Sequence, residues 1–173
     1  MIYIKAGQYG KDICMKKFLY TIAPATFFIC AGILSVVALY PQTSYAATSI
    51  TSWADLDAMR SGLSGSYVLT TDLDSNSAGY ATYAGSAANA GAGWSPVGDN
   101  STPFTGTFDG ANYSIKDIYI SRAATSYVGL FGKISGATVR NVRMTNAYVS
   151  GNSQVGGLTG AGTTGYTISG VYY

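Results

Sequence analysis

Aspartate side chains carry most of the chemistry that this sequence could perform. All 8 acidic residues are aspartates. Clustered carboxylates cleave glycosidic bonds, and loop oxygens can hold Ca²⁺. Asp72 and Asp74 alternate onto one face of a strand but also begin a loop, while Asp99 and Asp109 occupy turn sequences. With Asp117 they lack the ligand spacing of a calcium loop, so turn formation is favoured, and we expect no catalytic residue, metal or cofactor.

Other catalytic classes are excluded by residues that the sequence lacks. It contains no histidine, so the His-Glu-x-x-His helix of a zinc peptidase cannot form. A serine or cysteine triad lacks its imidazole for the same reason. A further domain downstream could still supply such chemistry, but the residues of this chain predict a protein that is not an enzyme.

A second candidate site is an outward-facing column of Tyr119, Arg143 and Tyr172. If their strands stack, the guanidinium lies between two phenol rings, where a cation–π contact contributes about 0.5–1 kcal/mol at an exposed site. Such a column could also stack on a sugar or on a protein partner. Ordinary side-chain stacking on a solvated sheet is the simpler interpretation.

The element that must position these side chains is an internal repeat over 104–173. Gly129-Leu-Phe-Gly132 recurs further along the chain as Gly157-Leu-Thr-Gly160. A period of this size is typical of stacked, solenoid-like folds. Taking Phe108, Leu130 and Leu158 as equivalent, the structural repeat residues are Gly106, Phe108, Gly110, Gly129, Leu130, Gly132, Gly157, Leu158 and Gly160.

The strand after each of these positions also repeats, at 115–120, 139–144 and 168–173. Its alternation breaks at Asp117, Asn141 and Gly170, residue types that tolerate a bend. The apolar positions should point inward and form the core, and they are Ile115, Ile118, Ile120, Val139, Val142, Met144, Ile168 and Val171. The last strand leaves an open edge, which further repeats or another chain would cover.

The N-terminal portion resembles an export signal. Residues 1–14 are interpreted as an upstream extension, which translation from Met15 would omit. Residues 15–46 are interpreted as a signal peptide with Met15-Lys-Lys17, an apolar core and a small-x-small site before Ala47. The uncharged run 18–40 is also long enough for an uncleaved anchor. Cys14 and Cys30 both lie in this portion, so the remainder relies on no disulfide.

Residues 47–103 should contain the first ordered elements. Ser52 is the expected N-cap of a short capping helix over 52–61, with Asp55 completing an approximate capping box and Gly62 ending the helix. A strand follows over 67–73. The Ser-, Ala- and Gly-rich stretch 74–93 is interpreted as an inserted surface loop with the least structure.

Composition restricts the partners of the folded part. Glycine is abundant (22), tyrosine is abundant (15), and only 10% of residues are charged, which favours an all-β domain. Without the four lysines and the aspartate that precede Thr48, six basic and seven acidic residues remain. The near-neutral balance argues against binding of nucleic acid or of an anionic membrane by this part, so the membrane is met only through the signal segment.

Several phrases, in this order, resemble the region of exported bacterial proteins that carries GLUG repeats. They are Trp53-Ala-Asp-Leu56, Gly65-Ser-Tyr-Val-Leu69, Trp94-Ser-Pro-Val-Gly98 and Pro103-Phe-Thr-Gly-Thr-Phe-Asp-Gly110, followed by Tyr127-Val-Gly-Leu-Phe-Gly132 and Val155-Gly-Gly-Leu-Thr-Gly160. The resemblance covers about residues 50–173. It implies a right-handed parallel β-helix of the kind found in filamentous-haemagglutinin-like adhesins and in some surface peptidases, but no single activity.

The leading hypothesis is therefore a non-enzymatic, adhesin-like surface module, secreted or held at the cell surface, that binds a glycan or a protein. Two alternatives stay open: the N-terminal β-helix part of a larger surface enzyme, either polysaccharide-active or a peptidase, and a purely structural stalk.

Overall fold

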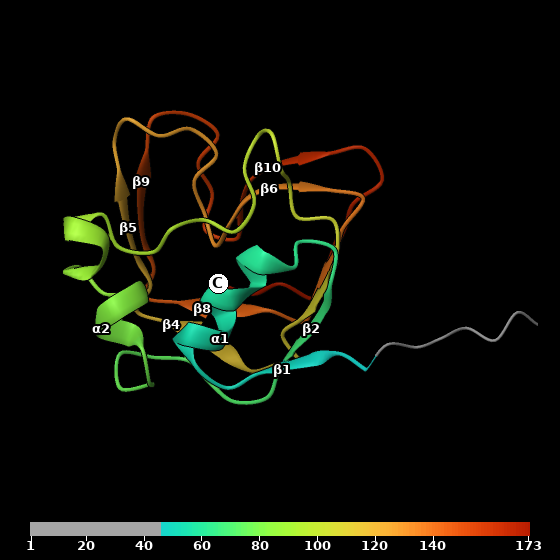
Figure 1. The fold of residues 1–173 in the computed structure, drawn as a ribbon, viewed down its shortest axis with the longest axis horizontal. Coiled ribbons are helices and arrows are strands. Elements are labelled where there is room, and N and C mark those ends of the chain that lie inside the picture. The colour runs from blue at the N-terminus through green and yellow to red at the C-terminus, as the bar shows by residue number, and fades with distance from the viewer. Residues whose placement is uncertain (1–45) are drawn as a thin grey trace, which may run out of the picture. The chain divides into compact units, whose positions relative to one another are not determined.

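The computed structural model describes residues 46–173 (Figure 1). The extension at 1–14 and the signal segment, apart from its last residue, lie outside the described residues. The helices are α1 (Trp53–Ala58) and α2 (Tyr80–Tyr83), with the 3-10 turns η1 (Met59–Ser61) and η2 (Ala88–Gly91). The strands are β1 (Thr48–Ile50), β2 (Ser66–Leu69), β3 (Thr107–Asp109), β4 (Ser114–Lys116), β5 (Tyr119–Arg122), β6 (Phe131–Ser135), β7 (Thr138–Arg140), β8 (Arg143–Thr145), β9 (Tyr148–Gly151), β10 (Thr159–Thr163) and β11 (Thr167–Ser169).

The strands form short parallel sheets, as expected of an all-β domain. One sheet has the order β1-β2-β3-β7-β11, and three two-stranded sheets pair β4 with β8, β5 with β9 and β6 with β10. In each of these three sheets the partners are equivalent segments of successive repeats. Ser114 pairs with Arg143, Tyr119 with Tyr148, and Phe131 with Thr159. The repeat seen in the sequence is thus a repeat of backbone pairing.

The register differs from the predicted one in two places. Ile115 lies opposite Met144, whereas the sequence comparison placed it opposite Val139. Val139 instead lies between Phe108 and Ile168, so Phe108 is not equivalent to Leu130. The error arose because each repeat contains two neighbouring strands with the same apolar alternation. The similarity of 115–120 to 139–144 aligned β4 with β7, whereas its partner in the structure is β8.

The turns between neighbouring strands use left-handed backbone at equivalent positions. Asp117 and Asn146, at the ends of β4 and β8, have φ of 61° and 52°. Asn141 and Gly170, after β7 and β11, have φ of 53° and 60°. Only glycine, asparagine and aspartate adopt this region readily, so the predicted bends at Asp117, Asn141 and Gly170 are confirmed.

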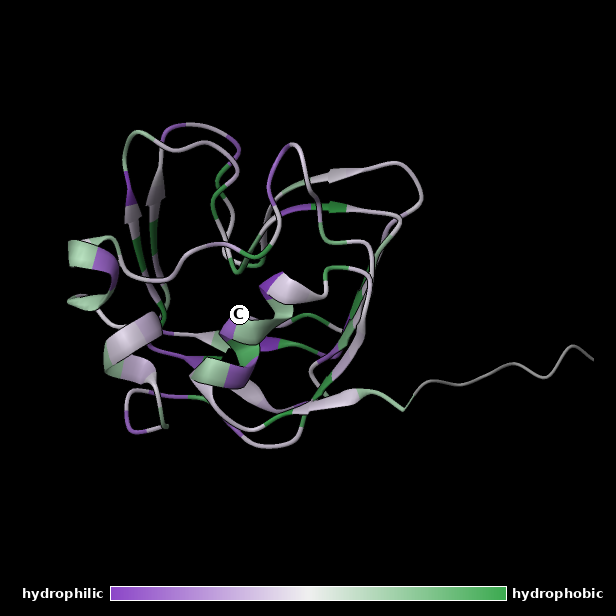
Figure 2. Cartoon of the chain, viewed as in Figure 1, coloured by the Kyte–Doolittle hydropathy of each residue, from purple (hydrophilic) through white to green (hydrophobic). Residues whose placement is uncertain are grey.

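One hydrophobic core lies between the sheets. Phe104 and Phe108 both pack against Phe131, with ring centroids 4.9 and 5.5 Å away. The strands carry both apolar and polar residues in Figure 2, and buried positions alternate with half-buried ones along β2 and β3, as expected of strands with one buried face. Of the residues predicted to point inward, Ile115, Ile118, Ile120, Val139, Val142 and Met144 are buried.

The last two predicted core positions are less covered than the other six. Ile168 on β11 is 37% exposed, and Val171 is only partly buried against the core. Both belong to the last repeat. This repeat is covered on one side only, because β11 is the outer strand of its sheet.

The N-terminal helix forms where the sequence predicts it. The Ser52 side chain accepts a hydrogen bond from the Asp55 backbone N–H, while the Asp55 carboxylate binds the N–H and hydroxyl of Thr51. The reciprocal bond therefore reaches one residue further back than in a standard capping box. Helix α1 and turn η1 direct Trp53, Leu56 and Met59 into the core.

Gly62 ends this helical segment for a different reason from the predicted one. Its φ is −144°, so it is not a left-handed C′ glycine. The Tyr67 hydroxyl donates to the Gly62 carbonyl, 2.6 Å away, and a Cβ on Gly62 would lie 2.5 Å from that hydroxyl. Close approach of the tyrosine, rather than a left-handed turn, favours glycine here.

The stretch 74–93 was wrongly predicted to be the least structured part. It contains α2 and η2 and buries Ala84 and Ala88. Tyr80 packs edge-on against Trp53, with ring centroids 5.9 Å apart. Small residues allow this close packing without any hydrophobic periodicity, which is why the sequence pattern did not indicate it.

Across residues 46–173, the helices are all too short or too polar to cross a membrane.

Replacing the buried Val142 by aspartate tests the core. The change puts an unpaired charge at a fully buried position and should lower the free energy of unfolding by about 3 kcal/mol or more. Far-UV circular dichroism and thermal melting measure it. Val155→Asp is the matched control, because Val155 is 43% exposed and the charge can stay hydrated. Equal melting temperatures for Val142→Asp and wild type would contradict the core assignment.

Candidate functional site

The candidate catalytic carboxylates are used in local turns and in links between strands. Asp99 accepts hydrogen bonds from the backbone N–H groups of Ser101 and Thr102, and Asp74 accepts one from Asn76. All seven aspartates of the described part accept a hydrogen bond from another residue, and they are Asp55, Asp57, Asp72, Asp74, Asp99, Asp109 and Asp117.

Three of these carboxylates connect neighbouring repeats. Asp72 accepts from the Ser114 N–H at 2.7 Å and lies 3.4 Å from the Lys116 ammonium. Asp109 forms an ion pair with Arg140 at 2.8 Å, and Asp117 accepts from Asn146 at 2.7 Å. Their role in the structure is to fix one strand against the next.

The pKa directions agree with this role. The Ser114 backbone N–H lowers the pKa of Asp72, the Thr102 N–H lowers that of Asp99, and the Asn146 amide lowers that of Asp117. Burial raises the pKa of Asp109, but hydrogen bonds, first from the Ala111 N–H, outweigh it and leave a lowered pKa. A general acid needs a raised pKa, so these aspartates are poorly suited to act as the general acid of glycosidic cleavage.

Within residues 46–173, no cluster of three acidic side chains is placed to hold a metal ion.

The predicted column of Tyr119, Arg143 and Tyr172 is only half correct. Arg143 does lie opposite Tyr172. Tyr119, however, lies on β5, opposite Tyr148 on β9, because β5 belongs to a different sheet from β8. The arginine is therefore not held between the two rings.

Tyr119 instead forms a stacked pair with Tyr148. The ring centroids are 4.9 Å apart and the ring planes differ by 10°. Tyr148 is 54% exposed, and since Tyr119 covers one of its faces, its other face and its edges provide that exposed surface. The pair is an aromatic surface that solvent and ligands can reach.

Polar groups surround this pair in a hollow of about 380 Å³, which we call the tyrosine groove. Asp117 and Asn146 lie two residues before Tyr119 and Tyr148. Each oxygen of Asp117 accepts one bond from the chain, from Asn146 and from the Ser75 N–H, and a carboxylate oxygen can accept a second. The other residues that line the groove are Ser75, Tyr80, Ser86 and Ile118.

The local fold fixes the position of this groove. The Tyr119 N–H donates to the Ala84 carbonyl, and the Trp94 N–H donates to the Tyr119 carbonyl. Gly93 lies so close to the Tyr119 backbone that a Cβ would collide with its carbonyl. The Tyr80 hydroxyl donates to the Asp117 carbonyl at 2.8 Å. The stretch 74–93 therefore forms one wall of the groove, and it braces β5.

Sequence reasoning missed Tyr148 and Asn146, although a signal for them exists. Lys116-Asp-Ile-Tyr-Ile-Ser121 recurs in the next repeat as Thr145-Asn-Ala-Tyr-Val-Ser150. This similarity joins Asp117 to Asn146 and Tyr119 to Tyr148, as in the structure. The similarity of 115–120 to 139–144 predicts a different alignment, in which Asp117 is not matched to Asn146 and Tyr119 is not matched to Tyr148.

Two known proteins resemble parts of the chain. Halomucin from Haloquadratum walsbyi is 33% identical over 135 residues, which are 76% of this chain and 1% of halomucin. A protein of Evansella cellulosilytica named as a Gly-rich membrane protein is 40% identical over 74 residues, which are 40% of this chain and 9% of that protein. The chain thus spans a small fraction of the length of both relatives. No protein-family model matches it, and no solved structure matches it significantly.

The lowered aspartate pKa values predict the acid sensitivity of the fold. A carboxylate with a depressed folded-state pKa stabilises the protein fully above its unfolded pKa of about 3.9, and this stabilisation is lost as the pH falls through the lower folded value. The free energy of unfolding should therefore fall between about pH 5 and pH 2. Urea unfolding measured at several pH values tests this.

The double variant Asp72→Asn, Asp117→Asn should show a shallower fall in stability over the same pH range. Asparagine keeps an oxygen that accepts a hydrogen bond at each site, and it tolerates the left-handed backbone at position 117. An acid dependence as steep as that of wild type would show that these two carboxylates are not the cause.

Proposed function

We propose that the chain is a non-enzymatic, adhesin-like module of an exported surface protein and that it binds a glycan in the tyrosine groove. The observation that carries this proposal is the exposed stack of Tyr119 on Tyr148 beside Asp117 and Asn146. Rigid aromatic side chains supply contact area at low entropic cost. Adjacent carboxylate and amide groups supply the directional hydrogen bonds that hydroxyl-rich ligands require.

A glycan is favoured over a protein partner by the size and shape of the groove. Its volume of about 380 Å³ lies within the range of sites that hold small molecules, and so it suits one or two sugar units. A stable protein interface buries roughly 800 Å² on each partner, which is much more than a hollow of this size offers.

The architecture proposed to carry the groove is a right-handed parallel β-helix. Parallel pairing between equivalent segments of successive repeats supports it, as does the five-stranded parallel sheet β1-β2-β3-β7-β11, which follows the order of the chain. In Figure 1, α1 lies over the middle of the area around which the sheets are arranged. That position suits a helix that caps the first repeat.

The proposed relationship to GLUG-repeat proteins is supported by the positions of the repeated glycines. The two Gly-Leu-x-Gly segments lead into β6 and β10, which pair in register. A Cβ on Gly129 would lie 2.5 Å from the Gly156 carbonyl oxygen, and one on Gly160 would collide with the Gln154 carbonyl. Close backbone approach thus gives a physical reason for glycine at position 129 and at the last position of both motifs, Gly132 and Gly160.

The open side of the last repeat is proposed to be covered by further repeats or by another chain. Ile168, Val155 and Tyr172 are 37%, 43% and 59% exposed along the outermost strands. Outer strands with exposed apolar side chains readily pair with additional strands. Both relatives are far longer than this chain, which agrees with an array of repeats.

The proposed location is the cell surface, reached through the signal segment at 15–46. The name of the Evansella relative places that protein in a membrane, which supports an association with the cell envelope here. The near-neutral charge of residues 46–173 agrees with a module that meets its partner outside the cell rather than on nucleic acid.

Tyr148→Ala tests glycan binding directly. A screen of the chain on a glycan array should identify a ligand, and the variant should bind it at least about tenfold more weakly, since a stacked aromatic contact contributes about 1.4 kcal/mol. Tyr113→Ala is the matched control, because Tyr113 is a similarly exposed tyrosine (40%) that does not line the groove. Unchanged affinity in Tyr148→Ala, or no glycan bound by wild type, would overturn the proposal.

A further inference from the structure

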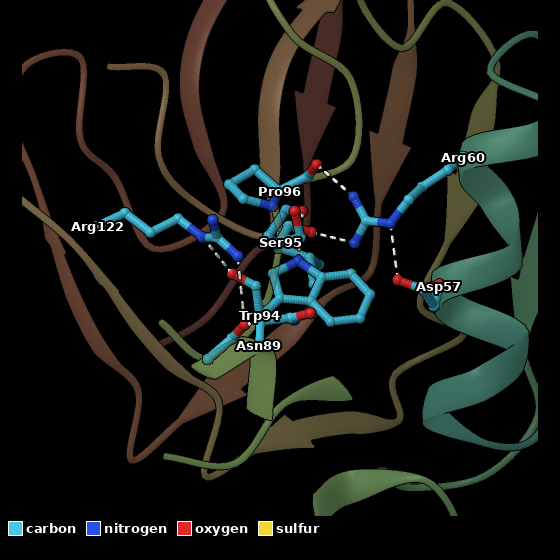
Figure 3. Close-up of polar contacts among 9 residues, drawn as sticks. Asp57, Arg60, Asn89, Trp94, Ser95, Pro96 and Arg122 are labelled. Carbon is cyan, nitrogen blue, oxygen red and sulfur yellow. Dashed lines mark hydrogen bonds and ion pairs between the residues drawn. The ribbon is translucent and has the colours of Figure 1, made fainter. Parts of the chain in front are cut away.

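A second hollow, of about 310 Å³, lies on the described part of the chain between two arginines. Arg60 comes from η1 and Arg122 from the end of β5. Figure 3 shows them on opposite sides of the segment Trp94-Ser95-Pro96, with both guanidinium groups turned toward its carbonyls. We call this hollow the arginine pocket.

Three of the five N–H donors of Arg60 are bonded to the protein itself. Its Nε donates to Asp57 at 2.7 Å, its Nη1 donates to the Pro96 carbonyl at 2.6 Å, and its Nη2 donates to the Ser95 carbonyl. The guanidinium carbon also lies 4.8 Å from the centre of the Trp94 ring. These contacts hold the charge at a fixed place beside the pocket.

Arg122 is held less completely. Its Nε donates to the Trp94 carbonyl at 3.0 Å and its Nη2 to the Gly93 carbonyl at 3.4 Å. Both acceptors are neutral, and among residues 46–173 no carboxylate lies within ion-pairing distance of Arg122. A guanidinium has five N–H donors, so several remain for a ligand.

The electrostatics of the pocket favour an anion. Burial and the nearby charge of Arg60 both lower the pKa of Arg122. The Lys133 ammonium lies 5.7 Å from the centre of the ring of Tyr127, a lining residue, and donates a hydrogen bond to Asn100. Asp99 also lines the pocket, and the three hydrogen bonds that it accepts from its own turn are all made by Oδ1.

Hydroxyl groups complete the lining. Thr125, Ser126 and Tyr127 come shortly after β5 and line the pocket with Arg122. The Ser126 hydroxyl is within 2.7 Å of the Ser153 hydroxyl, which holds it against the neighbouring repeat. A guanidinium with adjacent hydroxyls is the donor set that binds sulfate and carboxylate groups.

We propose that the arginine pocket binds an oxyanion, either a sulfate or a carboxylate group, with Arg122 as its main ligand and Arg60 as a fixed second charge. The two groups share the negative oxygens that a guanidinium fork recognises. This site is distinct from the tyrosine groove and does not depend on the proposed glycan binding.

Thermal melting and tryptophan fluorescence of the full chain test this proposal. Sodium sulfate and sodium acetate are titrated separately at constant ionic strength against sodium chloride. A saturable rise of the melting temperature by about 3 °C at ten times the Kd is expected for at least one oxyanion. The fluorescence should change over the same concentration range, because Trp94 lies beneath Arg60. The larger response shows which group the pocket prefers.

Arg122→Gln should abolish the oxyanion-specific shift, whereas Arg122→Lys should weaken it by keeping the charge without the fork. Arg143→Gln is the matched control, because Arg143 is an exposed arginine outside the pocket. The proposal is overturned if sulfate, acetate and chloride act alike on wild type, a result that does not depend on any variant folding. It is also overturned if Arg122→Gln responds like wild type.

Discussion

Parallel pairing between equivalent segments of successive repeats is the constraint on which this structure depends. Each strand finds its partner only if the chain turns at the same points in every repeat, since one extra residue would move the apolar side chains to the other face. Left-handed residues at matched positions, such as Asp117 with Asn146 and Asn141 with Gly170, provide those turns. Hydrogen bonds from Asn146 to Asp117 and from Asn141 to Asp109 then join one turn to the next.

The same constraint creates the tyrosine groove. Equivalent residues lie side by side in adjacent repeats, so a tyrosine at one position of two repeats becomes the stacked pair of Tyr119 and Tyr148. The stretch 74–93 and the segment Trp94–Pro96 interrupt the regular strands and supply the second wall of each site. Regular pairing therefore aligns the functional side chains, and the irregular segments shape the hollows around them.

Much of the fold was predictable from the sequence, because alternation, glycine spacing and turn residues are local signals. The all-β class, the Ser52 cap and the bends at Asp117, Asn141 and Gly170 followed from them. The register did not, because two strands of one repeat carry the same apolar pattern. The groove and the arginine pocket were missed because they depend on long-range contacts, such as Tyr80 with Asp117 and Arg60 with Pro96, which have no local signature.

Each strand pairs with its equivalent in the next repeat in a defined register. Nuclear Overhauser contacts in the isotopically labelled chain test this register directly. We expect contacts between Ile115 and Met144 and between Tyr119 and Tyr148, because these pairs face each other across β4–β8 and β5–β9. The similarity of 115–120 to 139–144 suggests a different register, in which Ile115 contacts Val139 in place of Met144. Observation of that contact would show that the register of the structure is wrong.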